Sequence, residues 1–466
     1  MEIAYHEALQ TIQTHPCARV TISPPNRLET SNWDLIAALA ASSLGDPLQT
    51  LRTMLRSMTG RRHVFFAPSC RAAIAEILSL LPQREVVMPA FTCPVVKTAV
   101  GLAGKQIQYV DIAPQSVNAT SEQFGEKARA GRILLPTHLF GIPTDVERIC
   151  DLARERDCVT IEDAAAAFGA KHNGRTLGTF ADFGVYSFER SKRLPAFRGA
   201  AIIVNNESLI DPEKLASHRV VRAEYEAPVR EAFMAAIYNL ATRPFLYGRV
   251  TLPRLLHAYR DDSAVSRCQR AADGPHTRFY TREFHRYQAA LVVRALHRLE
   301  AIRTHVGKVV AIYQDVLRSA PVETFMPPET DPAGLLRFPI SFQGQSRSDV
   351  LRAALRQGLY LETNFEQPLV EPDQYDQYPQ ALWAGRNLVL LPLYRRLNLQ
   401  AATRLAKQVA DIALQMSAMS RQEQVQEEHA TCQADGAFLP LRSATNQSRT
   451  TQHQLDMTHP RSGITL

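Results

Sequence analysis

The fold is constrained most by a regular alternation, between residues 62 and 204, of short apolar runs with helix-length amphipathic segments. The amphipathic segments cover residues 72–81, 94–102 and 145–156, and Thr144 is the expected N-cap of the last one. The strand-like runs cover residues 87–89, 107–110, 133–136, 159–162, 184–188 and 200–204. Because strands that alternate with helices usually pair in parallel, the pattern predicts an α/β fold, with a mostly parallel sheet flanked by helices.

Two polar side chains stand at the ends of neighbouring strand-like runs. Asp163 follows the run 159–162, and Lys192 follows the run that ends at Phe188. Ligands of parallel sheets bind outside the carboxyl ends of the strands, where Asp163 and Ser187 are expected to lie. An amine beside a carboxylate suits pyridoxal phosphate, because the amine forms an imine with the aldehyde and the carboxylate keeps the pyridine nitrogen protonated. The ordinary alternatives are a surface lysine and, for Asp163, a helix N-cap.

The rest of the chain falls into segments of different character. Residues 206–278 interrupt the alternation with a helical, apolar stretch that contains many arginines, and the pattern alone assigns it no role. A long helix is expected over about residues 284–318, followed by a smaller α/β segment to about Met416. Beyond Met416 the chain is polar and rich in Gln, Thr and Ser, which predicts a largely disordered tail. The expected divisions are a large domain of residues 1–280, a small C-terminal domain of residues 281–416 and a tail of residues 417–466.

The composition excludes several classes of protein. Of the 466 residues, 45% are hydrophobic and 21% are charged, as in ordinary globular enzymes. No uncharged apolar run reaches the roughly 18 residues of a membrane span, and no secretion signal is recognised, so we expect a cytoplasmic protein. Seven cysteines without a Cys-x-x-Cys pair argue against a disulfide framework and a metal site. The net charge of +7 comes from scattered residues, which disfavours a nucleic-acid partner and suits an anionic small substrate.

Six motifs, in this order along the chain, resemble those of the DegT/DnrJ/EryC1/StrS family of pyridoxal phosphate-dependent sugar aminotransferases. They are VMPAFT at 87–92, VDI at 110–112, HLFGIPTD at 138–145, IEDAAAAFGA at 161–170, NGRTLG at 173–178, and Ser187-Phe188 followed by Lys192. The resemblance covers roughly residues 45–205 and, more loosely, residues 280–415. It implies the fold type I transferase architecture with a smaller C-terminal α/β domain.

Taken residue by residue, the resemblance also implies the parts of a cofactor site. Lys192 is the lysine that carries pyridoxal phosphate, and Asp163 is the partner of the pyridinium nitrogen. Ser187 donates its hydroxyl to the cofactor phosphate. The same phosphate binds the backbone N–H groups of Cys70 and Arg71, at the start of a helix whose dipole favours an anion.

The chain departs from the family pattern at several positions. Cys93 stands where many members place an aromatic ring against the cofactor, so Phe91 or a residue outside that motif must cover this face. Ala166 replaces the usual Gln, and Phe-Arg-Gly-Ala at residues 197–200 replaces the usual Gly-Glu-Gly-Gly. An Asn-x-Arg element that reaches the neighbouring subunit's phosphate is absent, and Arg282 is the candidate substitute. The segment 206–278 is also longer than in typical members, which leaves the substrate more open than the cofactor.

The resemblance implies the transfer of an amino group, with glutamate as the expected donor, to a keto sugar that is expected to be nucleotide-linked. Family members form dimers whose active sites use both chains, so a homodimer is expected. A dehydratase with histidine in place of the lysine is disfavoured by Lys192. A fold type I enzyme for a non-sugar amine or ketone and a non-catalytic sensor of cofactor or sugar stay open. His138 lies on a predicted strand and is interpreted as a core histidine rather than a catalytic base.

Overall fold

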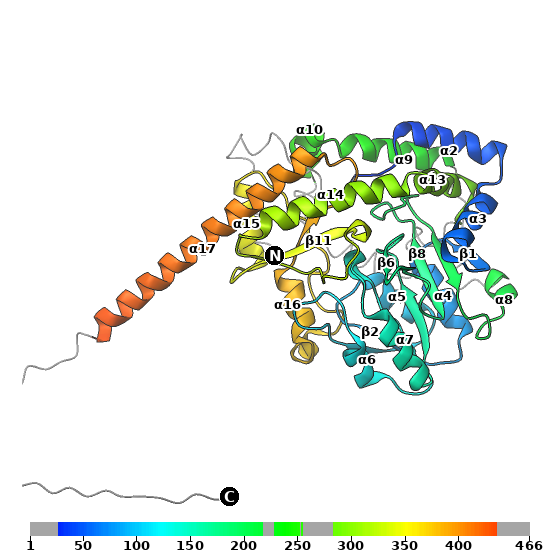
Figure 1. The fold of residues 1–466 in the computed structure, drawn as a ribbon, viewed down its shortest axis with the longest axis horizontal. Coiled ribbons are helices and arrows are strands. Elements are labelled where there is room, and N and C mark those ends of the chain that lie inside the picture. The colour runs from blue at the N-terminus through cyan, green and yellow to red at the C-terminus, as the bar shows by residue number, and fades with distance from the viewer. Residues whose placement is uncertain (1–26, 218–227, 252, 255–282, 436–466) are drawn as a thin grey trace, which may run out of the picture. The chain divides into compact units, whose positions relative to one another are not determined.

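A seven-stranded sheet forms the centre of the computed structural model, which describes residues 27–217, 228–251, 253–254 and 283–435 (Figure 1). The strand order is β1-β9-β8-β5-β4-β2-β3. The strands are β1 (His63–Ala67), β2 (Glu85–Pro89), β3 (Gln106–Val110), β4 (Arg132–Leu134), β5 (Val159–Asp163), β8 (Phe183–Ser187) and β9 (Ala200–Val204). All neighbours from β3 to β8 pair in parallel, whereas β9 is antiparallel to both β8 and β1. The predicted α/β fold with a mostly parallel sheet is therefore confirmed.

Helices cover both faces of this sheet because its strands are apolar on both sides. In β9, Ala200 and Ile202 pack in one core with α4 and α5, whereas Ala201 and Ile203 pack in another core with α3 and α13. This alternation is the period of two expected of a strand. The helices before β9 are α2 (Asn32–Leu44), α3 (Pro47–Thr59), α4 (Cys70–Leu80), α5 (Pro94–Leu102), α6 (Ser121–Lys127) and α7 (Val146–Glu155), and a small hairpin joins β6 (Lys171–His172) to β7 (Arg175–Thr176).

The start of α7 differs from the prediction. Asp145, not Thr144, occupies the N-cap position, and its side chain makes no capping hydrogen bond. The hydroxyl of Thr144 instead donates to the backbone oxygen of Ala119. A buried tertiary hydrogen bond thus takes the side chain that the sequence assigned to the cap.

The single long helix expected over residues 284–318 is wrong. Two helices, α13 (Arg286–Leu296) and α14 (Leu299–Leu317), are separated at Arg298, whose φ of −108° and ψ of 2° are not helical. The guanidinium groups of Arg294 and Arg298 bind the buried Asp34 carboxylate at 3.0 and 2.8 Å. Apolar spacing does not reveal this break, because Leu296 and Leu299 are buried on either side of it.

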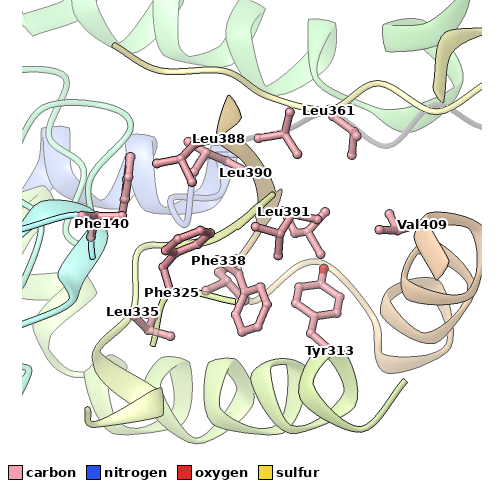
Figure 2. Packing of buried hydrophobic residues seen from close by; sticks show 14 of the residues in the cluster. Phe140, Tyr313, Phe325, Leu335, Phe338, Leu361, Leu388, Leu390, Leu391 and Val409 are labelled. Atoms are coloured by element: carbon pink, nitrogen blue, oxygen red, sulfur yellow. The ribbon is translucent and has the colours of Figure 1, made fainter. Parts of the chain in front are cut away.

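A second core lies around a three-stranded antiparallel sheet of β10 (Val322–Thr324), β11 (Arg337–Phe342) and β12 (Val389–Pro392). Figure 2 shows Phe338 of β11 beside Tyr313 of α14, with ring centroids 5.4 Å apart. The surrounding helices are α15 (Arg347–Arg356), α16 (Pro379–Asn387) and α17 (Leu399–Asp435), with short 3-10 turns η2 (Leu139–Gly141), η4 (Pro332–Gly334) and η5 (Pro372–Gln377). Since α13 shares its core with α2 and α3, the change of core falls near Leu299; the domain boundary after residue 280 stays a prediction.

The expectation of a disordered tail from residue 417 is wrong for residues 417–435, because α17 continues to Asp435. These residues are rich in Gln, Ala and Glu and contain neither Gly nor Pro, so their helix propensity is high although they lack an apolar period. Residues 436–466 lie outside the described part of the chain. Among the helices described, none combines the length and the apolar composition needed to cross a bilayer.

The stretch 206–278, which interrupts the predicted alternation, is described only in part. Its described elements are α8 (Pro212–Ser217), α9 (Pro228–Ala241), α10 (Pro244–Leu246) and the π-helix η3 (Tyr247–Thr251). Figure 1 shows α9 running beside α2.

Substitution of Gly184 in β8 tests how tightly the central strand is packed. A Cβ atom at this position would lie 1.9 Å from the backbone oxygen of Gly178, which cannot move as a flexible side chain could. We expect Gly184→Ala to lower the free energy of unfolding by about 3 kcal/mol or more in urea denaturation. The matched control is Gly101→Ala at an open position in α5, which should be neutral or about 0.5 kcal/mol more stable. Equal stabilities of the two variants would contradict this packing.

Candidate active site

A cavity of about 330 Å³ lies at the carboxyl ends of β5 and β8. The six residues that the sequence indicated all line it, and they come from four segments of the chain. They are Cys70, Arg71, Cys93, Asp163, Ser187 and Lys192. The parallel pairing of β5 with β8, in which Asp163 lies opposite Val185, brings the ends of both strands to one edge of the sheet. The structure therefore brings these six residues together around one cavity.

Asp163 presents a buried carboxyl group to this cavity. Burial raises its pKa, while a hydrogen bond from the Ala165 N–H at 3.0 Å and the charge of Lys192 oppose that rise. Its backbone is fixed on both sides, because its N–H donates to Pro136 and its carbonyl accepts from His138. A rigidly held acid that depends on nearby cations for its charge can pair with a protonated ring nitrogen.

Lys192 lies in the loop between β8 and β9, and backbone hydrogen bonds close this loop. The Phe188 N–H donates to Gly199 O, and the Ala196 N–H donates to Phe188 O, both at 2.8 Å. The Gly199 N–H donates to Pro68 O at 2.9 Å, which ties the loop to the segment before α4. The lysine is therefore carried on a constrained loop beside the N-terminus of α4.

The departure from the family pattern at residues 197–200 has a structural counterpart. Phe197 has a left-handed backbone with φ of 69°, where the family pattern has glycine, so the backbone keeps a conformation that glycine adopts freely. Arg198, at the position of the usual Glu, forms a buried ion pair of 2.6 Å with Glu231 of α9. Gln288 of α13 donates to the same carboxylate. Helix α9, which follows β9 in the chain, thus supplies the counterion of Arg198 on the loop that carries Lys192.

The N-terminus of α4 faces the cavity as an anion-binding element. Ser69 caps the helix by accepting a hydrogen bond from the Ala72 N–H at 3.2 Å. Helix geometry leaves the N–H groups of Cys70 and Arg71, the first two helical residues, without carbonyl partners inside the helix. Burial raises the pKa of the Cys70 thiol well above its usual value, with Asp163 adding to the rise, so the thiol stays neutral and does not repel an anion. Ser187 adds a hydroxyl to the same cavity.

The aromatic residues of the cavity are not the ones that the sequence suggested. Phe91 is buried but does not line the cavity, and Cys93 lines it as a neutral thiol whose pKa is raised by burial. Phe140 and Phe365 line it instead, with ring centroids 6.0 Å apart and planes inclined by 26°. Of the two alternatives for covering the cofactor, the cavity lining thus favours residues outside the motif at 87–92.

His138 is a core histidine, as expected. Its ring is fully buried, and its Nε2 lies 2.9 Å from Oε1 of Glu162. Since its Nδ1 accepts a hydrogen bond from the Thr144 N–H, the ring proton lies on Nε2 and is donated to Glu162. Glu162 also accepts the Phe180 N–H at 2.9 Å. This network supports the strand end that carries Asp163, from the opposite side of the strand.

Sequence reasoning missed the cavity residues that come from the C-terminal part of the chain. Leu336, Arg337, Asn364 and Phe365 line the cavity, and Arg337 forms a buried ion pair of 2.6 Å with Glu362. The available signal was one charged residue, Arg337, within the apolar run 335–342. Glu189 and Ser191, on the lysine loop, also line the cavity. Arg282, the candidate for the intersubunit contact, lies outside the described residues.

Comparisons with known proteins agree with this geometry. A model of the DegT/DnrJ/EryC1/StrS aminotransferase family matches residues 31–257 and 278–410. The chain is 31% identical over 192 residues to the pleiotropic regulatory protein of Geobacillus stearothermophilus, a match that covers 40% of this chain and 50% of that protein. It is 32% identical over 131 residues to GDP-perosamine synthase of Escherichia coli O157:H7, covering 27% of this chain and 35% of that protein. The chain therefore spans half or less of the length of these curated relatives.

The fold itself is shared with solved structures. The aminotransferase TlmJ from Streptoalloteichus hindustanus is similar with a TM-score of 0.63 at 17% identity, over 85% of this chain and all of that one (100%). This similarity confirms the fold type I transferase architecture that the motifs implied.

Phe365 offers a test of backbone strain beside the cavity, because its φ is 52°. Both Phe365→Ala and Phe365→Gly remove the ring, but only glycine relieves the left-handed strain. We expect the glycine variant to be about 1 kcal/mol more stable than the alanine variant in urea denaturation.

Phe338 provides the reverse comparison, since it lies in the extended strand β11. There the glycine variant should be about 0.5–1 kcal/mol less stable than the alanine variant. The same order of stabilities at both positions would show that the backbone of Phe365 is not strained.

Proposed function

This chain belongs to the DegT/DnrJ/EryC1/StrS aminotransferase family, and we propose that it is a pyridoxal phosphate-dependent aminotransferase acting on a keto sugar. The observation that carries the proposal is the convergence of an amine, a carboxylate, a hydroxyl and a helix N-terminus on one cavity. Glutamate is the proposed amino donor, and a nucleotide-linked keto sugar is the proposed acceptor; the name of the relative GDP-perosamine synthase, a nucleotide-sugar enzyme, supports this class.

The residues present fit pyridoxal phosphate. Asp163 would pair with the ring nitrogen, and Lys192 would hold the aldehyde carbon. The N–H groups of Cys70 and Arg71, together with the Ser187 hydroxyl, would hold the phosphate, because orphan amides and the helix dipole attract an anion. When bound, this cofactor supplies an electron sink for the negative charge that develops at the substrate carbon.

The chain's own contribution is proton transfer and the exclusion of water. The Nζ of Lys192 is the base that takes a proton from the substrate carbon and the acid that returns it. Asp163 keeps a compensating negative charge close to that amine in a buried setting, where electrostatic interactions are stronger than in water. Leu139, Phe140, Leu336 and Phe365 form an apolar side of the cavity that limits the access of water.

Other properties belong to the same proposal. We place the enzyme in the cytoplasm and propose a homodimer in which a residue of the partner subunit completes the phosphate site. Two rivals share the cofactor site: an enzyme for a non-sugar amine or ketone, and a sensor without catalysis. A purified protein whose cofactor spectrum responds to no amino donor would favour the sensor, whereas activity only with ketones that are not sugars would favour the other enzyme.

Lys192→Ala tests the covalent anchor. Borohydride reduction of the loaded wild-type protein should leave the cofactor attached to the peptide that contains Lys192. The variant should lose this attachment, and its transamination rate should fall at least about 100-fold, because the group that moves the proton is gone.

Lys171→Ala is the matched control for this test, since Lys171 is exposed in β6. It should keep both the covalent attachment and the rate. If borohydride labels another lysine in the wild-type protein, the assignment of Lys192 is wrong.

Asp163→Asn separates cofactor binding from its activation. The amide is almost the same size and keeps an oxygen for the Ala165 N–H, so the cofactor should still bind to Lys192. Without the carboxylate, the rate should fall at least about 100-fold, which corresponds to about 2.7 kcal/mol of transition-state stabilisation. Absorbance titration with cofactor and single-turnover rates with glutamate measure the two effects; an unchanged rate would remove Asp163 from the mechanism.

A further inference from the structure

Helix α9 buries polar side chains and exposes apolar ones, which is the reverse of an ordinary surface helix. Its buried residues include Glu231 and Asn239, each only 6% exposed, whereas Phe233 is 64% exposed. The polar side faces the protein because it makes specific contacts there: Glu231 pairs with Arg198, and the Asn239 amide donates to Thr30 O at 3.0 Å. The apolar side is turned outward, so ordinary core packing does not explain it.

The outward side of α9 continues onto neighbouring elements. Trp33 of α2 is 78% exposed and borders a hollow that is also lined by Ile237 and Leu240. Ile237 and Leu240 border a second hollow together with Val250. Phe245 of α10 is 62% exposed. We name this surface the α9 patch, defined by Trp33, Phe233, Ile237, Leu240, Phe245 and Val250.

The exposed charges on the described elements of the α9 patch all have one sign. Four exposed arginines belong to α9 and to the chain that follows it, and they are Arg230, Arg243, Arg249 and Arg254. Among the described residues of α2, α9, α10 and η3, the carboxylates are Asp34 and Glu231, and both are buried. An apolar surface containing Trp and Phe, bordered by arginine and without exposed acid, has the chemistry of a helix that lies in the headgroup region of an anionic bilayer.

We propose that the α9 patch docks the enzyme on the surface of an anionic lipid membrane, with α9 lying in the plane of the interface. A second copy of the chain fits this surface less well. A two-fold interface sets the same patch against itself, and among the described residues of α2, α9, α10 and η3 no exposed carboxylate is available to face the arginines of the other copy. An anionic bilayer offers both an apolar interior for the side chains and phosphate groups for the arginines.

The two tryptophans of the chain provide a direct reporter. In the variant Trp383→Phe, Trp33 of the α9 patch is the remaining fluorophore. The full-length variant, loaded with pyridoxal phosphate, is mixed with vesicles of phosphatidylglycerol and phosphatidylcholine or of phosphatidylcholine alone. We expect a blue shift of the Trp33 emission and its quenching by brominated acyl chains with the anionic vesicles, and a weaker response at high salt.

Substitutions in the wild-type background separate the apolar from the charged contribution. Phe233→Glu combined with Ile237→Glu should lower partitioning onto anionic vesicles at least about tenfold in co-sedimentation. Arg243→Gln, Arg249→Gln and Arg254→Gln should each lower it about fivefold. The matched control combines Met58→Glu with Leu414→Glu, two exposed apolar positions elsewhere, and should bind as wild type does. Cofactor absorbance and circular dichroism report that each variant is folded.

Each of the following results would overturn the proposal. The wild-type protein could fail to bind anionic vesicles, or it could bind them equally well with both glutamates in place. Alternatively, the double glutamate variant could change the oligomeric state in analytical ultracentrifugation while the wild type ignores vesicles, in which case the α9 patch is an interface between copies of the chain. If neither vesicles nor self-association is affected, another segment of the same chain covers the patch. Docking and transamination are measured separately, so failure of one leaves the other assignment standing.

Discussion

The candidate site depends on the parallel pairing of β5 with β8, because this pairing sets Asp163 and the lysine loop at the same edge of the sheet. Close packing and hydrogen bonds with the turn that contains Gly178 support this pairing. Gly184 of β8 leaves room for the backbone of Gly178, and Glu162 of β5 accepts N–H groups from the turn that contains Gly178. The buried carboxylate of Glu162 and the missing side chain of Gly184 thus help to position Asp163 and the loop that carries Lys192.

The motif HLFGIPTD joins the large sheet to the C-terminal core. Gly141 has φ of 86°, and a Cβ atom there would lie 2.6 Å from Gly334 O, so the turn requires glycine on both counts. The Leu336 N–H donates to Phe140 O at 2.7 Å, directly before Arg337. Residues of both cores therefore line the cavity. The part lined by Phe140, Leu336 and Arg337 depends on the close approach of the turns at Gly141 and Gly334.

The sequence predicted most of the sheet, because its strands are apolar on both faces and separated by amphipathic helices. It did not predict β1, which pairs antiparallel with β9 at one edge, or the break at Arg298, whose guanidinium binds the distant Asp34. All six predicted site residues line the cavity: Asp163, Ser187 and Lys192 lie in the quoted motifs, and Cys70, Arg71 and Cys93 were assigned by their positions in the family pattern. Phe365 lies in no such motif and Arg337 is marked only by its single charge within an apolar run, and it is folding that brings both segments to the cavity.

The buried pair between Arg198 and Glu231 has a further consequence for the evolution of this chain. Arg198 stands six residues after Lys192, and its counterion comes from a helix more than thirty residues away in the sequence. Loss of that helix would remove this ion pair from a buried guanidinium beside the lysine loop, and breaking a buried pair is costly. The extra helix is thus joined to the lysine loop by a buried charge pair, so a substitution on either side of the pair affects the other.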